Sequence, residues 1–114
     1  MVEPVKLLRI YTDEAAYYGD RKVLEVIASR AREAALAGVT VLEALIGFGR
    51  SAHQHRRHVL ESDRAVVIEI VDAEARLRPF VAGLADIPGI GLMTLEAVEI
   101  VGGSAADTGA AQAE

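Results

Sequence analysis

The sequence has no cysteine and no tryptophan among its 114 residues. Without cysteine it can form no disulfide, no thiolate zinc site and no cysteine nucleophile. Aromatic residues make up only 4% of the chain, so the core must be built from valine, isoleucine, leucine and alanine. No apolar run approaches the roughly 20 residues that a membrane-spanning helix needs. The first residues, MVEPV, lack the basic start and apolar run of a signal peptide, and we expect a cytoplasmic protein.

Positive charge is also in short supply, since the net charge is −5. An acidic chain repels phosphate backbones, and we therefore expect no nucleic-acid partner. With 52% hydrophobic and 25% charged residues, the chain can bury the core of one ordinary domain. We place this domain at residues 1–101. The small and polar residues that follow predict a flexible tail at 102–114.

Apolar and β-branched residues predict four strands and two helices. The strands are expected at 5–12, 39–46, 65–71 and 92–101, the last with a bulge between Ala97 and Val98. The first helix is expected to begin at an Asp20 cap and to end at Gly38. The second is expected to follow an Asp72 cap, with Pro79 inside its apolar pattern. A glycine-rich turn at 88–91 leads into the last strand.

This order is β-α-β-β-α-β, which predicts an α+β, ferredoxin-like fold. Two helices would cover one face of a four-stranded antiparallel sheet. The strand at 65–71 is apolar on both sides, although a sheet with one solvent-facing side should alternate apolar and polar residues. We therefore expect the second face to pack against other copies in a closed homo-oligomer.

The segment from Gly38 to Arg50 reads GVTVLEALIGFGR. It resembles the second strand of the PII signal-transduction proteins, in which Gly-x-Thr-Val leads into Gly-Phe-Gly-Arg and then a long loop. Matches spread over residues 5–101, among them KLLRIY at Lys6 and VVIEIVD at Val66, are similar to the PII-like family called "domain of unknown function 190". The resemblance implies a non-catalytic homotrimer that senses a small ligand, often an adenine nucleotide, between subunits. It also implies that the loop 50–63 docks onto a membrane transporter or an enzyme.

The resemblance also assigns candidate ligand-binding residues. Thr40 would lie near a base, while Gly89 and Gly91 would lie in the turn that faces the neighbouring subunit. The phosphate side would be formed by Gly47, Gly49, Arg50 and Ser51, with Phe48 between them.

Several features differ from the PII pattern. Ser51 stands where PII proteins have a glutamine, and the turn at 86–91 is short and lacks their phosphate-binding lysine. The cofactor therefore remains unknown, with an adenine nucleotide as the candidate.

Glu69 interrupts an otherwise apolar strand. A buried carboxylate is costly unless it is paired. We expect Glu69 either to face the intersubunit cleft and pair with Arg9 or Arg50, or to occupy an exposed position on the sheet.

His53, His55 and His58 lie close together in the sequence. Histidines at such spacing can bind zinc. Arg56 and Arg57 would repel a cation, however, so we predict no metal site and a solvated loop that meets a partner. Two other interpretations stay open: a small enzyme of the same fold that uses these histidines, and an adaptor without a ligand.

Overall fold

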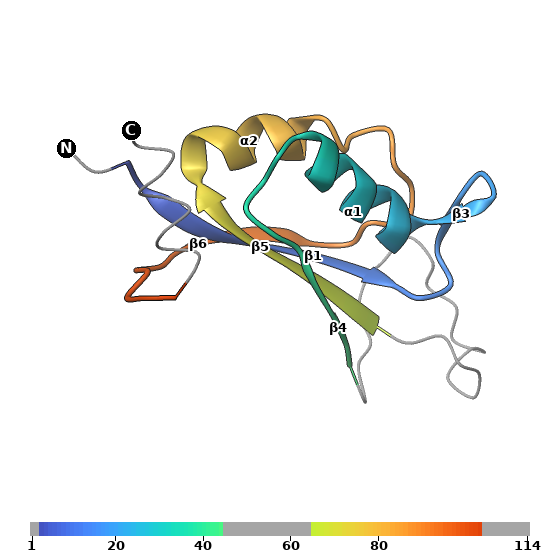
Figure 1. Ribbon diagram of the computed structural model, residues 1–114. Helices are drawn as coiled ribbons and strands as arrows, with labels where there is room; N and C mark the ends of the chain where they lie inside the picture. The colour runs from blue at the N-terminus through green and yellow to red at the C-terminus, as the bar shows by residue number, and fades with distance from the viewer. Residues whose placement is uncertain (1–2, 45–64, 104–114) are drawn as a thin grey trace.

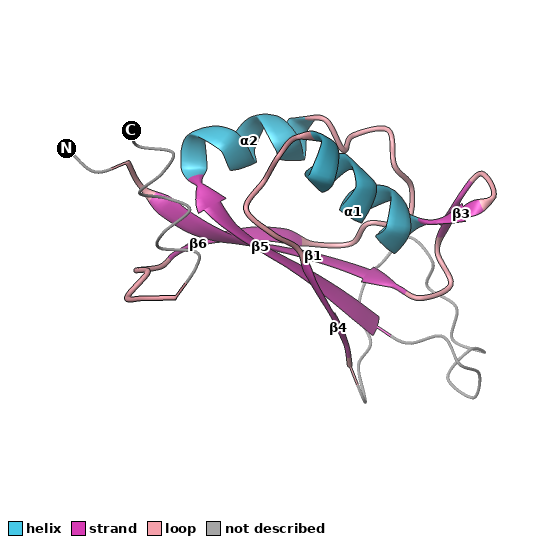
Figure 2. Cartoon of the chain, in the orientation of Figure 1, coloured by secondary structure: helices cyan, strands magenta, loops and turns pink. Residues whose placement is uncertain are grey.

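The computed structural model describes residues 3–44 and 65–103. The elements follow the order β1 (Val5–Asp13), β2 (Tyr17–Tyr18), β3 (Arg21–Lys22), α1 (Val23–Glu33), β4 (Thr40–Glu43), β5 (Ala65–Ala73), α2 (Glu74–Ala82) and β6 (Met93–Ala97). Four of the strands form one sheet in the order β4-β5-β1-β6, and every pairing in it is antiparallel. Both helices lie on the same side of this sheet (Figures 1 and 2). The α+β, ferredoxin-like architecture predicted from the sequence is confirmed.

The core lies between the sheet and the two helices. On β5, Val66, Ile68 and Ile70 are buried, whereas the residues between them are only partly buried. This alternation follows from the period of two along a strand, which sends neighbouring side chains to opposite faces. The helices contribute apolar side chains to the same layer, among them Ile27, Ala31, Leu77 and Phe80.

The other side of the sheet, which we call the open face, is formed by alternate residues of the same strands. On β1 and β5 these are Leu7, Arg9, Tyr11, Val67, Glu69 and Val71, which meet in the pairs Leu7–Val71, Arg9–Glu69 and Tyr11–Val67. All except Tyr11 are partly buried, and Tyr11 is exposed. The prediction that the strand at 65–71 is apolar on both sides is therefore confirmed by its burial pattern.

The helix starts differ from those predicted. Residues 17–22 form a small antiparallel hairpin, β2–β3, so that Asp20 lies in its turn and α1 begins only after Lys22. Asp72 remains in β5, opposite Lys6, and α2 begins after Ala73. The buried carboxylate of Asp72 instead accepts hydrogen bonds from the backbone N–H groups of Ala37 and Ala73, at 2.8 and 2.7 Å.

Other boundaries are shorter than expected. α1 ends at Glu33, and Ala35, rather than Gly38, takes the left-handed conformation after the helix, with φ 59°. β6 ends at Ala97, where a bulge was predicted, so the change in the apolar pattern marks the end of the strand. Pro79 lies inside α2 without ending it. In the described part of the chain, no helix has the length and apolar character needed to cross a membrane.

Candidate functional site

Four of the predicted ligand-binding residues are described: Thr40, Glu69, Gly89 and Gly91. The others, Gly47, Phe48, Gly49, Arg50 and Ser51, lie outside the described residues, as do the predicted loop 50–63 and its histidines His53, His55 and His58. The described candidates come from β4, β5 and the turn before β6.

Thr40 and Glu69 belong to one row of side chains across the open face. Thr40 at the start of β4 pairs with Glu69 on β5, which pairs with Arg9 on β1. Arg9 pairs in turn with Thr94 on β6. Directly opposed residues of antiparallel strands project to the same face, so the four side chains cross the whole sheet side by side. Of the alternatives expected for Glu69, the structure shows the pairing with Arg9.

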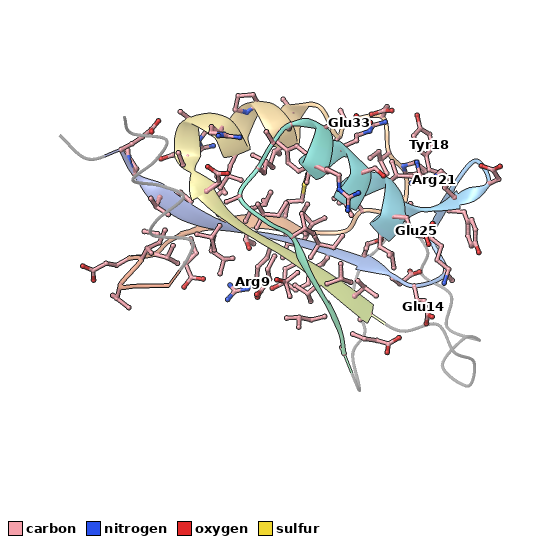
Figure 3. The ribbon with its side chains drawn as sticks, in the orientation of Figure 1. Arg9, Glu14, Tyr18, Arg21, Glu25 and Glu33 are labelled. Carbon is pink, nitrogen blue, oxygen red and sulfur yellow. The ribbon has the colours of Figure 1, made fainter. Side chains whose placement is uncertain are left out.

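Arg9 lies between two carboxylates on this face. Its Nε is 3.2 Å from Oε2 of Glu69, and its Nη1 is 2.8 Å from Oε1 of Glu96. Figure 3 shows Arg9 on the side of the sheet away from the helices. The hydrogen bonds from Arg9 to Glu96 and to Glu69 raise the pKa of Arg9 above its usual value. The middle of the open face therefore holds the guanidinium of Arg9, which is paired with two carboxylates. Apolar side chains lie on either side of this charged group.

Gly89 and Gly91 lie in the connection between α2 and β6. Gly89 is buried and has a φ of 81°, a conformation that glycine adopts without steric cost. Its carbonyl accepts a 2.7 Å hydrogen bond from the hydroxyl of Thr12. The N–H of Gly91 donates to the carbonyl of Tyr11 at 2.7 Å, and the N–H of Tyr11 donates to the carbonyl of Leu92 at 2.9 Å. The turn is therefore fixed against the end of β1.

Thr40 and the glycine turn lie on opposite edges of the sheet. Thr40 is on the edge strand β4, while the turn with Gly89 and Gly91 leads into the other edge strand, β6. The pairing of β4 with β5 ends with a 2.8 Å hydrogen bond, which the N–H of Ala44 donates to the carbonyl of Ala65. Ala65 pairs with Asp13, so Ala44 and Ala65 lie at the end of the sheet where β1 meets the glycine turn. The structure thus places Thr40 and Glu69 in the row through the middle of the sheet, whereas Gly89 and Gly91 lie near the end of β1, on the side of the other edge.

Sequence reasoning missed a cluster on the helix side of the molecule. Tyr18 on the hairpin, Arg30 on α1 and Asp86 after α2 meet there through side-chain hydrogen bonds. Tyr18 and Asp86 are 68 residues apart in the sequence, and Arg30 and Asp86 are 56 apart. No local spacing signals such a contact, because only the packing of α1 against the connection between α2 and β6 creates it.

A hollow of about 330 Å³ lies between α2 and β6. Its lining consists of Leu8, Arg78, Val81, Met93, Thr94 and Leu95. Apart from Thr94, none of these belongs to the row that crosses the open face, and none is a predicted ligand residue. Within residues 3–44 and 65–103, no group of histidine, cysteine and acidic side chains is arranged to hold a metal ion.

The fold is similar to that of a solved structure, CPII from Thiomonas intermedia K12, bound to ADP, AMP and acetate. The two share 19% sequence identity with a TM-score of 0.61, over 90% of this chain and 93% of CPII, which shows a shared PII-like fold. The UPF0166 protein of Aquifex aeolicus (strain VF5) is 37% identical over 100 residues, which is 84% of this chain and 92% of that protein. Residues 5–100 match the DUF190 family, described as "Uncharacterized ACR, COG1993". The chain therefore belongs to the DUF190 family, as the resemblance in its sequence indicated.

Proposed function

We propose that this protein is a PII-like regulator that senses an adenine nucleotide in the cleft between the subunits of a homotrimer. It then acts on a partner through the segment 50–63 and catalyses no reaction. The observation that carries the proposal is the likeness of its fold to CPII, a protein whose structure holds ADP, AMP and acetate. We expect this regulator in the cytoplasm, with an enzyme or a membrane transporter as its target.

The open face supports the homotrimer. Leu7, Val67 and Val71 are apolar side chains on a face that neither helix covers, and Leu42 on β4 is 47% exposed beside them. Apolar residues on both sides of a sheet are typical of sheets that are covered on both faces. Three copies around an axis would cover this face and leave the helices outside.

The two edges of the sheet support a site between subunits. Thr40 lies on β4 and Gly91 lies beside β1 and β6, with three strand-to-strand steps from one edge to the other, or about 14 Å. If β4 of one copy approaches the β6 edge of the next, Thr40 and the neighbour's turn can contact one ligand. Glu69, beside Thr40, would then face the same cleft.

The predicted phosphate side supports an anionic ligand. Gly47, Gly49 and Arg50 follow β4 in the sequence, and glycine backbone N–H groups with a guanidinium are well suited to hold phosphate oxygens. A protein with a net charge of −5 needs such a local concentration of donors to bind an anion. Arg50, Arg56, Arg57 and Arg64 supply the positive charge of this region.

The test is isothermal titration calorimetry of the full chain against AMP, ADP, ATP and cyclic AMP, each with and without magnesium. We expect saturable, micromolar binding of one of them, and Arg50→Ala should weaken it more than Arg78→Ala on the outside of α2. Light scattering on the same samples should give three times the chain mass of 12.1 kDa.

Absence of binding for all four nucleotides would overturn the nucleotide part of the proposal. Turnover of a bound nucleotide that is lost in His53→Ala or His55→Ala would instead identify an enzyme. A trimer that binds none of the four would point to the ligand-free adaptor.

A further inference from the structure

Tyr18, Arg30 and Asp86 form a cluster that we call the clamp. The guanidinium of Arg30 donates two parallel hydrogen bonds to Asp86, Nη1 to Oδ1 at 2.9 Å and Nη2 to Oδ2 at 3.0 Å. The hydroxyl of Tyr18 donates to Oδ2 of the same carboxylate at 2.6 Å. The guanidinium carbon also lies 5.8 Å from the centre of the Tyr18 ring, within range of a cation–π contact. Figure 3 shows Tyr18 on the hairpin beside α1.

The clamp holds the segment that leads into the glycine turn. Besides Asp86, Arg30 binds the carbonyl of Gly83 through Nη1 at 2.8 Å. Between Gly83 and Gly89, Leu84 and Ile87 are buried in the core. The far side of the turn is held separately, by Thr12 at Gly89 and by Tyr11 at Gly91. Residues 83–91 are therefore fixed from two sides, by the clamp on one and by β1 on the other.

The charges of the clamp favour the paired state. The hydrogen bond from Arg30 is the main reason that the pKa of Asp86 lies well below its usual range, and the hydrogen bond from Tyr18 lowers it further. The same contact raises the pKa of Arg30 above its usual value, and the acceptor Asp86 raises that of the Tyr18 hydroxyl. At neutral pH the carboxylate is charged and accepts all three side-chain hydrogen bonds.

The position of the clamp indicates more than general stabilisation. The side chains of Arg30 and Asp86 are 30% and 50% exposed, and ion pairs exposed to this extent contribute little to stability. A bidentate arginine–carboxylate pair fixes geometry, however, because both groups are planar and have only one good relative orientation. Here it fixes a connection between two elements and ties it to a hairpin 68 residues away in sequence.

We propose that the clamp positions the glycine turn 88–91 for ligand, so that nucleotide affinity depends on Tyr18, Arg30 and Asp86 although none of them belongs to the predicted ligand contacts. This inference rests on the proposed function for the identity of the ligand. The hairpin β2–β3 would thereby be coupled to the site, since a partner that moved Tyr18 would release one side of the turn.

The experiment compares Asp86→Asn, Arg30→Lys and Tyr18→Phe with the wild-type chain. Glu74→Gln is the matched control, because it removes a carboxylate charge from another arginine pair, Glu74–Arg78 at 2.7 Å, away from the turn. Hydrogen exchange of the backbone amides of residues 84–87 and 89–92 reports the turn, since Pro88 has no amide hydrogen. Calorimetry with ADP and AMP reports the ligand. We expect faster exchange in Asp86→Asn and affinity lowered about twofold to thirtyfold, the range for residues that act on a site without touching it. Arg30→Lys should also speed exchange and lower affinity. Lysine keeps the positive charge but cannot make the two parallel hydrogen bonds of the guanidinium.

Exchange at 84–92 that is no faster in Asp86→Asn than in Glu74→Gln overturns the inference, and so does unchanged affinity in a variant whose turn exchanges faster. A wild-type chain that binds no nucleotide overturns the proposed function. In that case the exchange data still decide whether the clamp holds the turn.

Discussion

Arg9 and Glu69 face each other across β1 and β5, with the Nε of Arg9 3.2 Å from the carboxylate of Glu69, on the face of the sheet opposite the helices. In a single chain this pair is about one-third exposed on each side. If other subunits cover the open face, the pair becomes an interior one. Removing one partner would then leave a charge without its counterion in the interface.

We therefore expect Arg9→Ala to weaken the homotrimer by about tenfold or more in its dissociation constant, as is typical when one member of an interfacial charge pair is truncated. The double variant Arg9→Met/Glu69→Met should assemble better than Arg9→Ala, because it removes the charge of Glu69 together with that of Arg9 and leaves only the more exposed Glu96 without its partner. Analytical ultracentrifugation over a range of protein concentrations measures this. Arg78→Ala on the helix side is the control, and a trimer equally stable in all variants would place the open face outside the interface.

Thr40 offers a direct test of the predicted base contact. Thr40→Val keeps the shape of the side chain and removes only the hydroxyl, so an exposed edge strand should tolerate it. If the hydroxyl bonds the base, the loss of one hydrogen bond of about 1 kcal/mol weakens nucleotide binding roughly fivefold. Calorimetry checks this, with Ser29→Ala on α1 as a control for the loss of a hydroxyl. Equal affinities in Thr40→Val and the wild type would remove Thr40 from the site.

Replacing Ala35 by glycine should stabilise the folded chain. Its φ of 59° is a left-handed conformation that costs an L-residue roughly 1 kcal/mol, which glycine avoids. Ala35→Gly should therefore raise the free energy of unfolding by about 1 kcal/mol, as measured by urea denaturation. Ala34→Gly, at an ordinary φ of −80°, should lower it instead. A loss of stability in Ala35→Gly would contradict the left-handed end of α1.

Asp86 predicts an acid-dependent loss of stability. Because Arg30 holds the pKa of Asp86 well below its ordinary value of 3.8, the carboxylate contributes stability that is fully present above the unfolded-state pKa. That contribution is lost as the pH falls through the lower, folded-state pKa. Because the pair is largely exposed, this contribution is small, and we expect the wild-type free energy of unfolding to fall only slightly more steeply than that of Asp86→Asn below about pH 4.

Denaturation curves at a series of pH values measure this difference between the two proteins. Asp20→Asn, which changes a carboxylate in the turn of the hairpin, should keep the wild-type slope. Parallel profiles for Asp86→Asn and the wild type would mean that the ion pair does not persist in solution.

Much of the fold could be predicted because its signals are local. The apolar, β-branched run at 65–71 predicts a strand, and the structure confirms it as β5 with alternating burial. The charged pair Arg9–Glu69 was also among the expected pairings, because an acidic residue inside an apolar strand needs a partner nearby.

The helix caps were predicted wrongly, and the hairpin was missed, for a physical reason. Asp20 and Asp72 have the right residue type for a cap, but residues 17–22 pair with one another, and Asp72 is drawn into β5 opposite Lys6. At both positions the chain forms strand pairs where a helix cap was expected. The clamp could not be predicted at all, since it depends on three segments that only tertiary packing brings together.

The opposite-edge arrangement of Thr40 and Gly91 has a consequence for how such a protein would respond in a cell. A ligand held by β4 of one copy and the turn of the next is bound by an assembly and by no single chain. Ligand and subunits then stabilise one another by mass action. The half-saturating ligand concentration would fall as the protein becomes more abundant, so the same nucleotide level would be read differently at low and at high expression.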